Sequence, residues 1–384
     1  MEKRLWELDS LRGLASLTVV FSHLFLIFPQ MYTDDTTLIL IFKYSPLHLF
    51  WAGREAVIFF FVLSGFVLSI PFNNGNSPSY ISFFIKRAFR IYIPYYVAIM
   101  AGIVSKSFLQ KGDLIGLSDW FNSFWKLDIS LTSVITHLVL ISDFDTRVID
   151  PVIWSLVYEM RISLLFPLLM CFVCRYNWKL CFGTSIAIEM LFRGLIAIHK
   201  KGILSIGIDA STLDAIYMTV HFTVMFVVGA LLAKHKRSLV ELCSASRKSI
   251  KLALFTLGLA LYISDWLTFH YINLFLDYLI AIGVSIIIVT SLSSESISRF
   301  LMNRYVVVLG KISYSLYLLH FIVLCSCLYL LYGIIPIWIV LMIAFIASIT
   351  VSLASYYWVE VPSIQWGKKL SGWAMKKDVP AKQK

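Results

Sequence analysis

Apolar runs of about 20 residues, separated by short polar segments, occupy most of this 384-residue chain. An α-helix needs about 20 apolar residues to cross the hydrocarbon core of a bilayer. The pattern therefore predicts an all-α fold, a polytopic integral membrane bundle of about ten transmembrane helices. The predicted spans are residues 8–29, 55–72, 91–109, 152–174, 178–198, 212–233, 252–271, 272–292, 306–331 and 334–358.

Charged residues are few and unevenly placed. They make up 14% of the sequence, against roughly 25% in ordinary soluble domains. The net charge of +11 could indicate a nucleic-acid partner, but the basic residues form short clusters between apolar runs, such as residues 86–90 and 234–251. This arrangement is typical of membrane topology, and the positive-inside rule places both termini in the cytoplasm. We therefore expect a transmembrane domain at residues 1–359 and a short basic cytoplasmic tail at 360–384.

The first predicted span contains Asp9, Arg12 and His23, although each ionisable group at membrane depth costs at least a few kcal/mol. Arg12 and His23 are 11 residues apart, which is about three helical turns or about 16 Å along one face. Asp9 precedes Arg12 by three residues on the same face and can neutralise it. His23 is then either a satisfied core histidine or a residue that takes part in chemistry.

The stretch "WSLVYEM" places Glu159 near the outer start of the fourth span, after Trp154 and Ser155. Arg161 is two positions away and cannot face Glu159 on a helix, so the carboxylate needs a partner on another helix. It could accept a hydrogen bond from His23 and orient it as a base. Elsewhere, Glu189 and Arg193 are four residues apart and are expected to form a structural ion pair.

Arg87 and Arg90 project from one side of a helix at the cytoplasmic boundary. Such a pair suits a phosphate-rich ligand from the cytoplasm, but it also suits ordinary topology anchoring or contact with lipid phosphates. The longest outer segment, residues 110–151, is acidic and aromatic. Its cluster of Trp120, Phe121, Phe124 and Trp125 is either a membrane-interface anchor or a stacking surface for a sugar. The six cysteines indicate neither a disulfide framework nor a metal site.

Five stretches in order resemble one family. They are "LDSLRGLASLTVVFSH" (8–23), "AVIFFFVLSGFVLS" (56–69), R-x-x-R (87–90), "WSLVYEM" (154–160) and "GKISYSLYLLH" (310–320). Together they resemble the acyltransferase-3 family of bacterial membrane O-acyltransferases. The resemblance implies a multi-pass enzyme of the inner membrane that moves an acyl group, commonly acetyl, from cytoplasmic acyl-CoA to a carbohydrate hydroxyl at the outer face. It implies acyl-CoA, a carbohydrate acceptor and the lipid bilayer as partners, and no metal.

The family's R-x10-H motif falls on Arg12 and His23, and its W-S-x-x-x-E motif falls on Trp154, Ser155 and Glu159. The resemblance implies that Arg12, Arg87 and Arg90 bind the phosphates of acyl-CoA. It makes His23 the general base and Glu159 its orienter. Met160 stands where many members carry a second acidic residue, so no role is expected for a carboxylate pair.

Supporting roles are expected for other residues of these motifs. Ser155, Tyr314 and Tyr317 could donate to an oxyanion, Asp9 pairs with Arg12, and Ser64 is expected to allow close helix packing. His320 either binds substrate or fixes a helix contact.

Two other functions also suit buried charges in a helical bundle. A polytopic transporter or flippase for a glycan or lipid-linked sugar is the main alternative. A lipid-linked glycosyltransferase would usually need acidic metal ligands or a soluble nucleotide-sugar domain, and the chain has no such domain.

Overall fold

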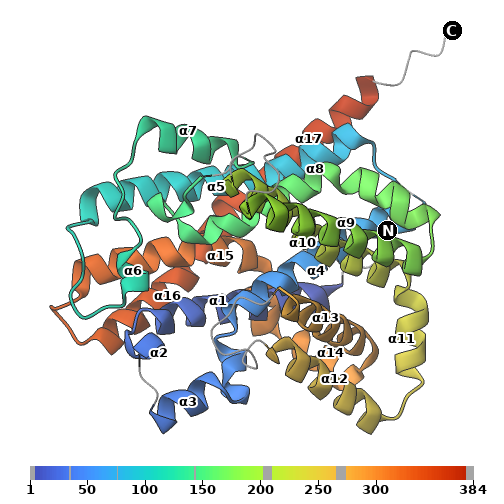
Figure 1. The fold of residues 1–384 in the computed structure, drawn as a ribbon, viewed down its shortest axis with the longest axis horizontal. Coiled ribbons are helices and arrows are strands. Elements are labelled where there is room, and N and C mark those ends of the chain that lie inside the picture. Colours follow the sequence, from blue (N-terminus) through green and yellow to red (C-terminus); the bar gives the residue numbers. More distant parts are fainter. Residues whose placement is uncertain are drawn as a thin grey trace.

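A computed structural model describes residues 5–33, 36–75, 77–141, 144–201, 210–264 and 274–377. These residues are helical almost throughout. They contain no β-strand, only an isolated β-bridge between Tyr332 and Ile335. The predicted all-α, polytopic membrane fold is confirmed (Figure 1).

Within the described residues, each predicted span overlaps a helix. These helices are α1 (Trp6–Leu26), α4 (Gly53–Asn73), α5 (Tyr80–Leu109), α8 (Trp154–Arg175), α9 (Trp178–Lys200), α10 (Ala210–Lys234), α12 (Lys248–Tyr262), α13 (Leu276–Ser293), α15 (Arg304–Leu331) and α16 (Ile337–Ser355). In the described part of the chain, eight helices are long and apolar enough to cross a membrane. The other two predicted spans are α1, which carries the charged stripe, and α12, which has 15 residues. The predicted joint near Tyr271 lies outside the described residues.

Short helices connect the spans. They are α2 (Gln30–Thr33), α3 (Thr37–Lys43), η1 (Pro46–Phe50), α6 (Asp119–Asn122), α7 (Leu131–Val139), η2 (Thr146–Val148), η3 (Pro151–Ile153), α11 (Lys236–Ser244) and α14 (Glu295–Leu301). The one at Leu131–Val139 has nine residues, which agrees with the expectation that this apolar stretch is too short to span.

Helix α5 begins 11 residues before the predicted span. Ser79 caps it, with its side chain accepting from the backbone N–H of Ser82 at 3.3 Å. Arg87 and Arg90 therefore lie two to three turns inside a 30-residue helix. Apolar periodicity did not locate this start, because one face of the first turns of α5 packs on another helix.

That helix is formed by the predicted tail. A π-helical segment, η5 (Tyr356–Glu360), continues α16 into α17 (Val361–Lys377), and α17 packs along α5. Gly367 lies against Phe89, and the hydroxyls of Ser371 and Ser82 are 2.6 Å apart. The tail is thus helical as far as Lys377, and its contacts with α5 extend to Ser371.

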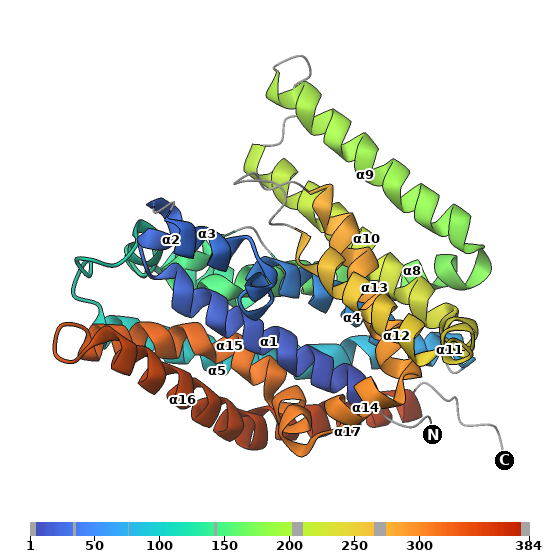
Figure 2. The same ribbon diagram turned by 90° about the horizontal axis from the view of Figure 1, so that it is seen from below.

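Helices α1 and α15 run parallel and in close contact (Figures 1 and 2). A Cβ added to Gly13 would overlap the backbone of Gly310, and a Cβ added to Gly310 would lie 2.6 Å from the carbonyl carbon of Asp9. Small residues allow such close approach of membrane helices. His23 and His320 each follow their glycine by ten residues, or about 15 Å along each helix, so this contact brings the two histidines side by side.

A second close contact joins α4 to α10, where a Cβ on Gly65 or on Gly229 would meet the backbone of the other helix. Helix α9 lies at the edge of the bundle and packs mainly on α10 (Figure 2). The small residue that packs in "LSGF" is therefore Gly65, whereas Ser64 is free to hydrogen-bond.

Gly310→Leu should destabilise the bundle by about 1–3 kcal/mol, because the new side chain must push α15 away from the backbone of α1. The measurement is the thermal unfolding midpoint in detergent. Gly183→Leu on α9 is the control, since a Cβ at Gly183 meets no atom within 4 Å. Equal midpoints for the two variants would contradict the role given to this contact.

Candidate active site

His23 on α1 and His320 on α15 form a hydrogen-bonded pair. Nδ1 of His23 lies 2.8 Å from Nε2 of His320, and the two rings are nearly parallel, at an interplanar angle of 11°. Nδ1 of His320 lies 2.9 Å from the backbone oxygen of Leu316. The structure therefore assigns a helix-to-helix contact to His320 and gives His23 a histidine as its partner.

The partners of His320 fix the tautomers of both neutral rings. A backbone carbonyl can only accept, so Nδ1 of His320 carries the hydrogen that bonds Leu316. Nε2 of His320 is then an acceptor, and Nδ1 of His23 donates to it. The lone pair of His23 is left on Nε2, which makes no hydrogen bond with the described residues.

His23 lies in the wall of a cavity of about 660 Å³ at the end of the bundle that is predicted to face outward; we call it the outer cavity. The ring of Trp120 lies 5.5 Å from that of His23, and Phe321 meets it edge-on at 5.3 Å. The polar and aromatic part of the wall consists of Ser22, His23, His48, Trp51, Arg54, Glu55, Trp120, Ser123, Phe124, Thr146, Arg147, Trp154 and Tyr317.

The aromatic residues of the outer segment face the protein and not the membrane interface. Phe121 and Trp125 are each 1% exposed, and the indole N–H of Trp125 donates to the Ile149 carbonyl at 2.8 Å. Trp120 and Phe124 line the outer cavity. The membrane-anchor interpretation is therefore wrong for this cluster, which instead holds the outer segment over His23.

Arg87 and Glu159 form an ion pair in the middle of the bundle. Arg87 also donates through Nε to Ser163 at 3.0 Å, and Ser64 donates to Glu159 at 3.2 Å. The predicted contact between Glu159 and His23 is not formed, because the carboxylate is taken up by Arg87 on α5. The R-x-x-R and W-S-x-x-x-E motifs are thus joined by a direct ion pair.

This ion pair borders a small cavity of about 70 Å³, which we call the central cavity. Ser155 lines this cavity and Tyr317 lines both it and the outer cavity, and their hydroxyls are 2.7 Å apart. Tyr317 also donates to the Val152 carbonyl at 3.0 Å. Tyr314 lines the same cavity and donates to the Ile91 carbonyl at 3.0 Å, so its proton is already used.

A third cavity, of about 440 Å³, lies at the opposite end of the bundle, which is predicted to face the cytoplasm; we call it the inner cavity. Arg12 lies there in an ion pair with Asp9 at 3.5 Å, the pairing that helical spacing predicted. Arg90 makes no ion pair or hydrogen bond with the described residues. The charged lining consists of Asp9, Arg12, Arg90, Lys311, Glu360 and Lys368.

The three cavities lie in series. Arg12, Arg90 and Tyr314 line both the inner and the central cavity, while Val57 and Tyr317 line both the central and the outer cavity. The stripe from Arg12 to His23 therefore follows this series along α1, as the shared helical face predicted.

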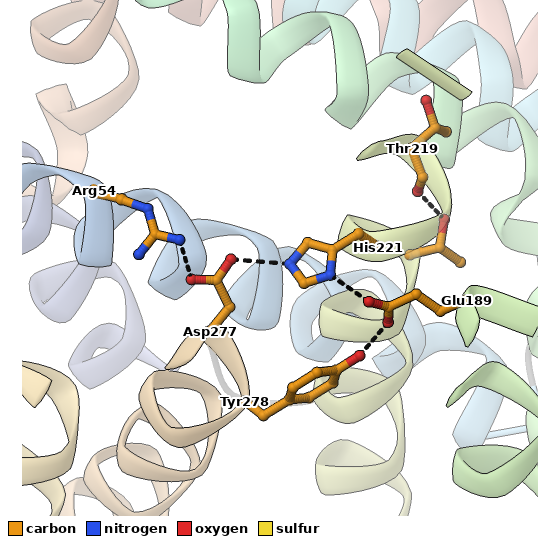
Figure 3. A network of polar contacts seen from close by, with 7 residues as sticks. Arg54, Glu189, Thr219, His221, Asp277 and Tyr278 are labelled. Carbon is orange, nitrogen blue, oxygen red and sulfur yellow. Dashed lines mark hydrogen bonds and ion pairs between the residues drawn. The ribbon is translucent and has the colours of Figure 1, made fainter. Parts of the chain in front are cut away.

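Sequence reasoning missed a buried network beside the outer cavity (Figure 3). Arg54 donates to Asp277 at 2.6 Å, and the two ring nitrogens of His221 lie 2.9 Å from Asp277 and 2.8 Å from Glu189. Tyr278 donates to the other oxygen of Glu189. The predicted Glu189–Arg193 ion pair is absent from the described residues. The available signal was that His221, Asp277 and Glu189 are all ionisable residues inside apolar spans.

Charge balance explains how this network can be buried. His221 is fully buried, and Glu189 and Asp277 are each 1% exposed. Two ionised carboxylates facing both ring nitrogens require both to carry hydrogen, which makes His221 an imidazolium. Arg54 and His221 then neutralise Asp277 and Glu189, so four helices are joined without a net charge in the core.

A second arginine reaches the outer cavity from the loop before α8. Nε of Arg147 donates to Oδ1 of Asp145 at 2.9 Å, and Nη2 donates to Oδ2 at 2.7 Å. The ion pair is therefore bidentate. These hydrogen bonds lower the pKa of the Asp145 carboxyl. The pair therefore keeps Arg147 oriented along the cavity wall.

An all-helical membrane bundle with a histidine pair between an aromatic and a basic cavity defines a class of polytopic membrane enzyme. A family model described as an acyltransferase domain, that of the acyltransferase-3 family, matches residues 5–357. The chain belongs to this family and is a multi-pass membrane acyltransferase that transfers groups other than aminoacyl groups. Comparison with curated proteins and with solved structures gave no match.

His221→Leu should destabilise the protein by about 3–5 kcal/mol, because two buried carboxylates would lose the cation between them. The measurement is the unfolding free energy in detergent. Glu241→Gln is the control, since it removes an ion pair with Arg237 that is exposed to solvent and therefore contributes little to stability. A similarly small effect for both variants would contradict the charge balance described above.

Proposed function

We propose that this protein transfers an acyl group, in the first instance acetyl, from cytoplasmic acyl-CoA to a hydroxyl of an extracytoplasmic carbohydrate, and that it does so in the inner membrane. The observation that supports this most is the free lone pair on Nε2 of His23, which the His320–Leu316 chain leaves facing the outer cavity. The family supplies the reaction class.

His23 is the general base in this proposal. Its Nε2 takes the proton of the acceptor hydroxyl while the hydroxyl oxygen attacks the thioester carbonyl carbon. The resulting imidazolium is stabilised by the lone pair of His320 Nε2, which still accepts from Nδ1 of His23. Collapse of the tetrahedral intermediate breaks the C–S bond, and the proton leaves with the CoA thiolate as the thiol. His320 is a positioning residue, since it acts through His23.

The donor binds at the inner cavity. Arg12 and Arg90 face both the inner and the central cavity, and Arg90 has no carboxylate partner among the described residues. Arginines bind phosphate through several donors at once, so this position suits the diphosphate of CoA. Arg87 has a different role, because Glu159 and Ser163 occupy its donors.

The narrow point between the central and outer cavities is where donor and acceptor meet. Ser155 and Tyr317 place two hydroxyls there, 2.7 Å apart. A tetrahedral oxyanion needs nearby hydrogen-bond donors. Because Tyr317 donates to the Val152 carbonyl, Ser155 is the donor in this proposal, and its hydroxyl turns from Tyr317 to the oxyanion. The pantetheine arm would reach them through the central cavity.

The outer cavity suits a sugar. Trp51, Trp120 and Trp154 give it apolar ring faces, while Arg54, Glu55 and Arg147 give it polar groups at the same wall. Such a mixture of ring faces and hydrogen-bonding groups binds a carbohydrate through both its C–H and its O–H surfaces.

A transporter or flippase could use the same series of cavities to move a glycan. The family favours acyl transfer. The histidine pair also favours acyl transfer. A protein that only translocates a glycan does not need a second ring to fix the tautomer of His23.

His23→Ala should lower acyl transfer by a factor of about 10²–10⁴, the usual contribution of a general base. His320→Leu should lower kcat and leave KM for acetyl-CoA unchanged, and His320→Gln should restore part of kcat because its amide can replace Nε2 as an acceptor. The measurement is the acyl content of surface glycans by mass spectrometry, together with turnover in membranes.

Full transfer by a folded His23→Ala protein would contradict the assignment of the base. Equal kcat for His320→Leu and His320→Gln would contradict the positioning role. Loss of the surface glycan itself, in place of its acyl groups, would favour the flippase alternative.

Arg90→Ala should impair donor binding, whereas Arg87→Ala should impair stability. We expect the first to raise KM for acetyl-CoA about tenfold with little change in kcat, as for the loss of one charge-assisted contact. The second should lower stability by about 3–5 kcal/mol, because it leaves Glu159 unpaired. Steady-state kinetics and thermal unfolding would separate them, and identical kinetic and stability defects would contradict the distinction.

A further inference from the structure

Helix α17 contributes to the wall of the inner cavity although it lies beyond the residues that the family model matches. The match ends at residue 357. Glu360, Ile364 and Lys368 nevertheless line the same cavity as Arg12 and Arg90. The family match therefore does not account for this part of the wall.

The position of α17 is fixed by specific contacts. Gly367 lies against Phe89 on α5, one residue before Arg90, and a Cβ added to Gly367 would lie 2.8 Å from the Cβ of Phe89. The hydroxyl pair of Ser371 and Ser82 secures the next turn at 2.6 Å. Because Lys368 directly follows Gly367, this packing places Lys368 next to α5, the helix that carries Arg90.

Lys368 is a cation without an ion pair or hydrogen bond among the described residues. Glu360, the carboxylate on the same helical path, accepts from Ser315 at 2.9 Å. Four cations (Arg12, Arg90, Lys311 and Lys368) and two carboxylates (Asp9 and Glu360) line the cavity, so its charge favours an anion.

The cations lie at different depths. Arg12 and Arg90 also line the central cavity, whereas Lys368 lines only the inner cavity and is exposed. Lys368 is therefore at the mouth, and the two arginines are farther in.

We propose that Lys368 binds the 3′-phosphate of the acyl-CoA donor and that α17 is part of the donor site. The proposal rests on the proposed function. The thioester of the donor must reach the central cavity, so the donor enters with its acyl end first. Its diphosphate then lies beside the deeper arginines, Arg12 and Arg90. The 3′-phosphoadenosine at the other end then remains at the mouth, beside Lys368. A lipid headgroup phosphate is the other anion with this chemistry, and the experiment separates the two.

The experiment compares two donors on the full-length protein in detergent. Acetyl-CoA carries the 3′-phosphate, and 3′-dephospho-acetyl-CoA lacks only that group. Lys368→Ala is compared with Lys369→Ala, which removes an adjacent lysine of equal charge that does not line the cavity. Both positions are exposed and helical, where alanine is well tolerated.

We expect wild type and Lys369→Ala to bind acetyl-CoA about tenfold more tightly than the dephospho donor. Lys368→Ala should bind acetyl-CoA only as tightly as wild type binds the dephospho donor, and its affinity for the dephospho donor should not change. A phosphate preference that survives in Lys368→Ala would overturn the proposal. So would equal losses for the two lysine variants, or a loss in Lys368→Ala that is the same for both donors, as expected for a lipid contact. If wild type bound neither donor, the proposed function itself would fail.

Discussion

The contact between α1 and α15, made through Gly13 and Gly310, sets the distance between His23 and His320. Two parallel helices that are in contact at one point have the same rise per residue. Residues ten positions after the contact on each helix therefore lie at the same level along the bundle. The ring pair depends on this register. The Leu316 carbonyl that fixes its tautomer lies one turn before His320 on α15 itself. The same face of α1 carries Arg12 past the inner and central cavities. One close helix crossing therefore aligns the proposed base with the proposed path of the donor.

Burial of charge is the second constraint on this bundle. Most ionised groups in its interior are matched. Arg87 is paired with Glu159, Arg12 with Asp9, and His221 with two carboxylates. Two cations that line the inner cavity, Arg90 and Lys368, have no carboxylate partner among the described residues. A cation without a carboxylate partner is tolerable where an anionic ligand or water supplies the counter-charge. These two cations therefore mark the proposed donor end, and the paired groups hold the helices together.

Helical periodicity was sufficient to predict the spans, the shared face of Arg12 and His23 and the pairing of Asp9 with Arg12, because these depend on one helix at a time. Partners on different helices were not predictable. The positions of Glu159 and His23 along their spans allowed a contact between them. The packing of α5 on α8 instead pairs Glu159 with Arg87. Likewise, the local spacing of Glu189 and Arg193 was outweighed by His221 and Tyr278 from α10 and α13. The packing of the predicted basic tail on α5 was not predictable either, because composition does not show which helix a polar segment contacts.

The central claim is that donor and acceptor meet from opposite ends of the bundle through three cavities in series. Sealed inside-out and right-side-out membrane vesicles containing the protein and its native glycans, supplied with radiolabelled acetyl-CoA in the medium, test it most directly. We predict that only inside-out vesicles become labelled and that the labelled glycan is released only after they are permeabilised. Equal labelling of sealed right-side-out vesicles would show that both substrates bind on the same side and would contradict the account.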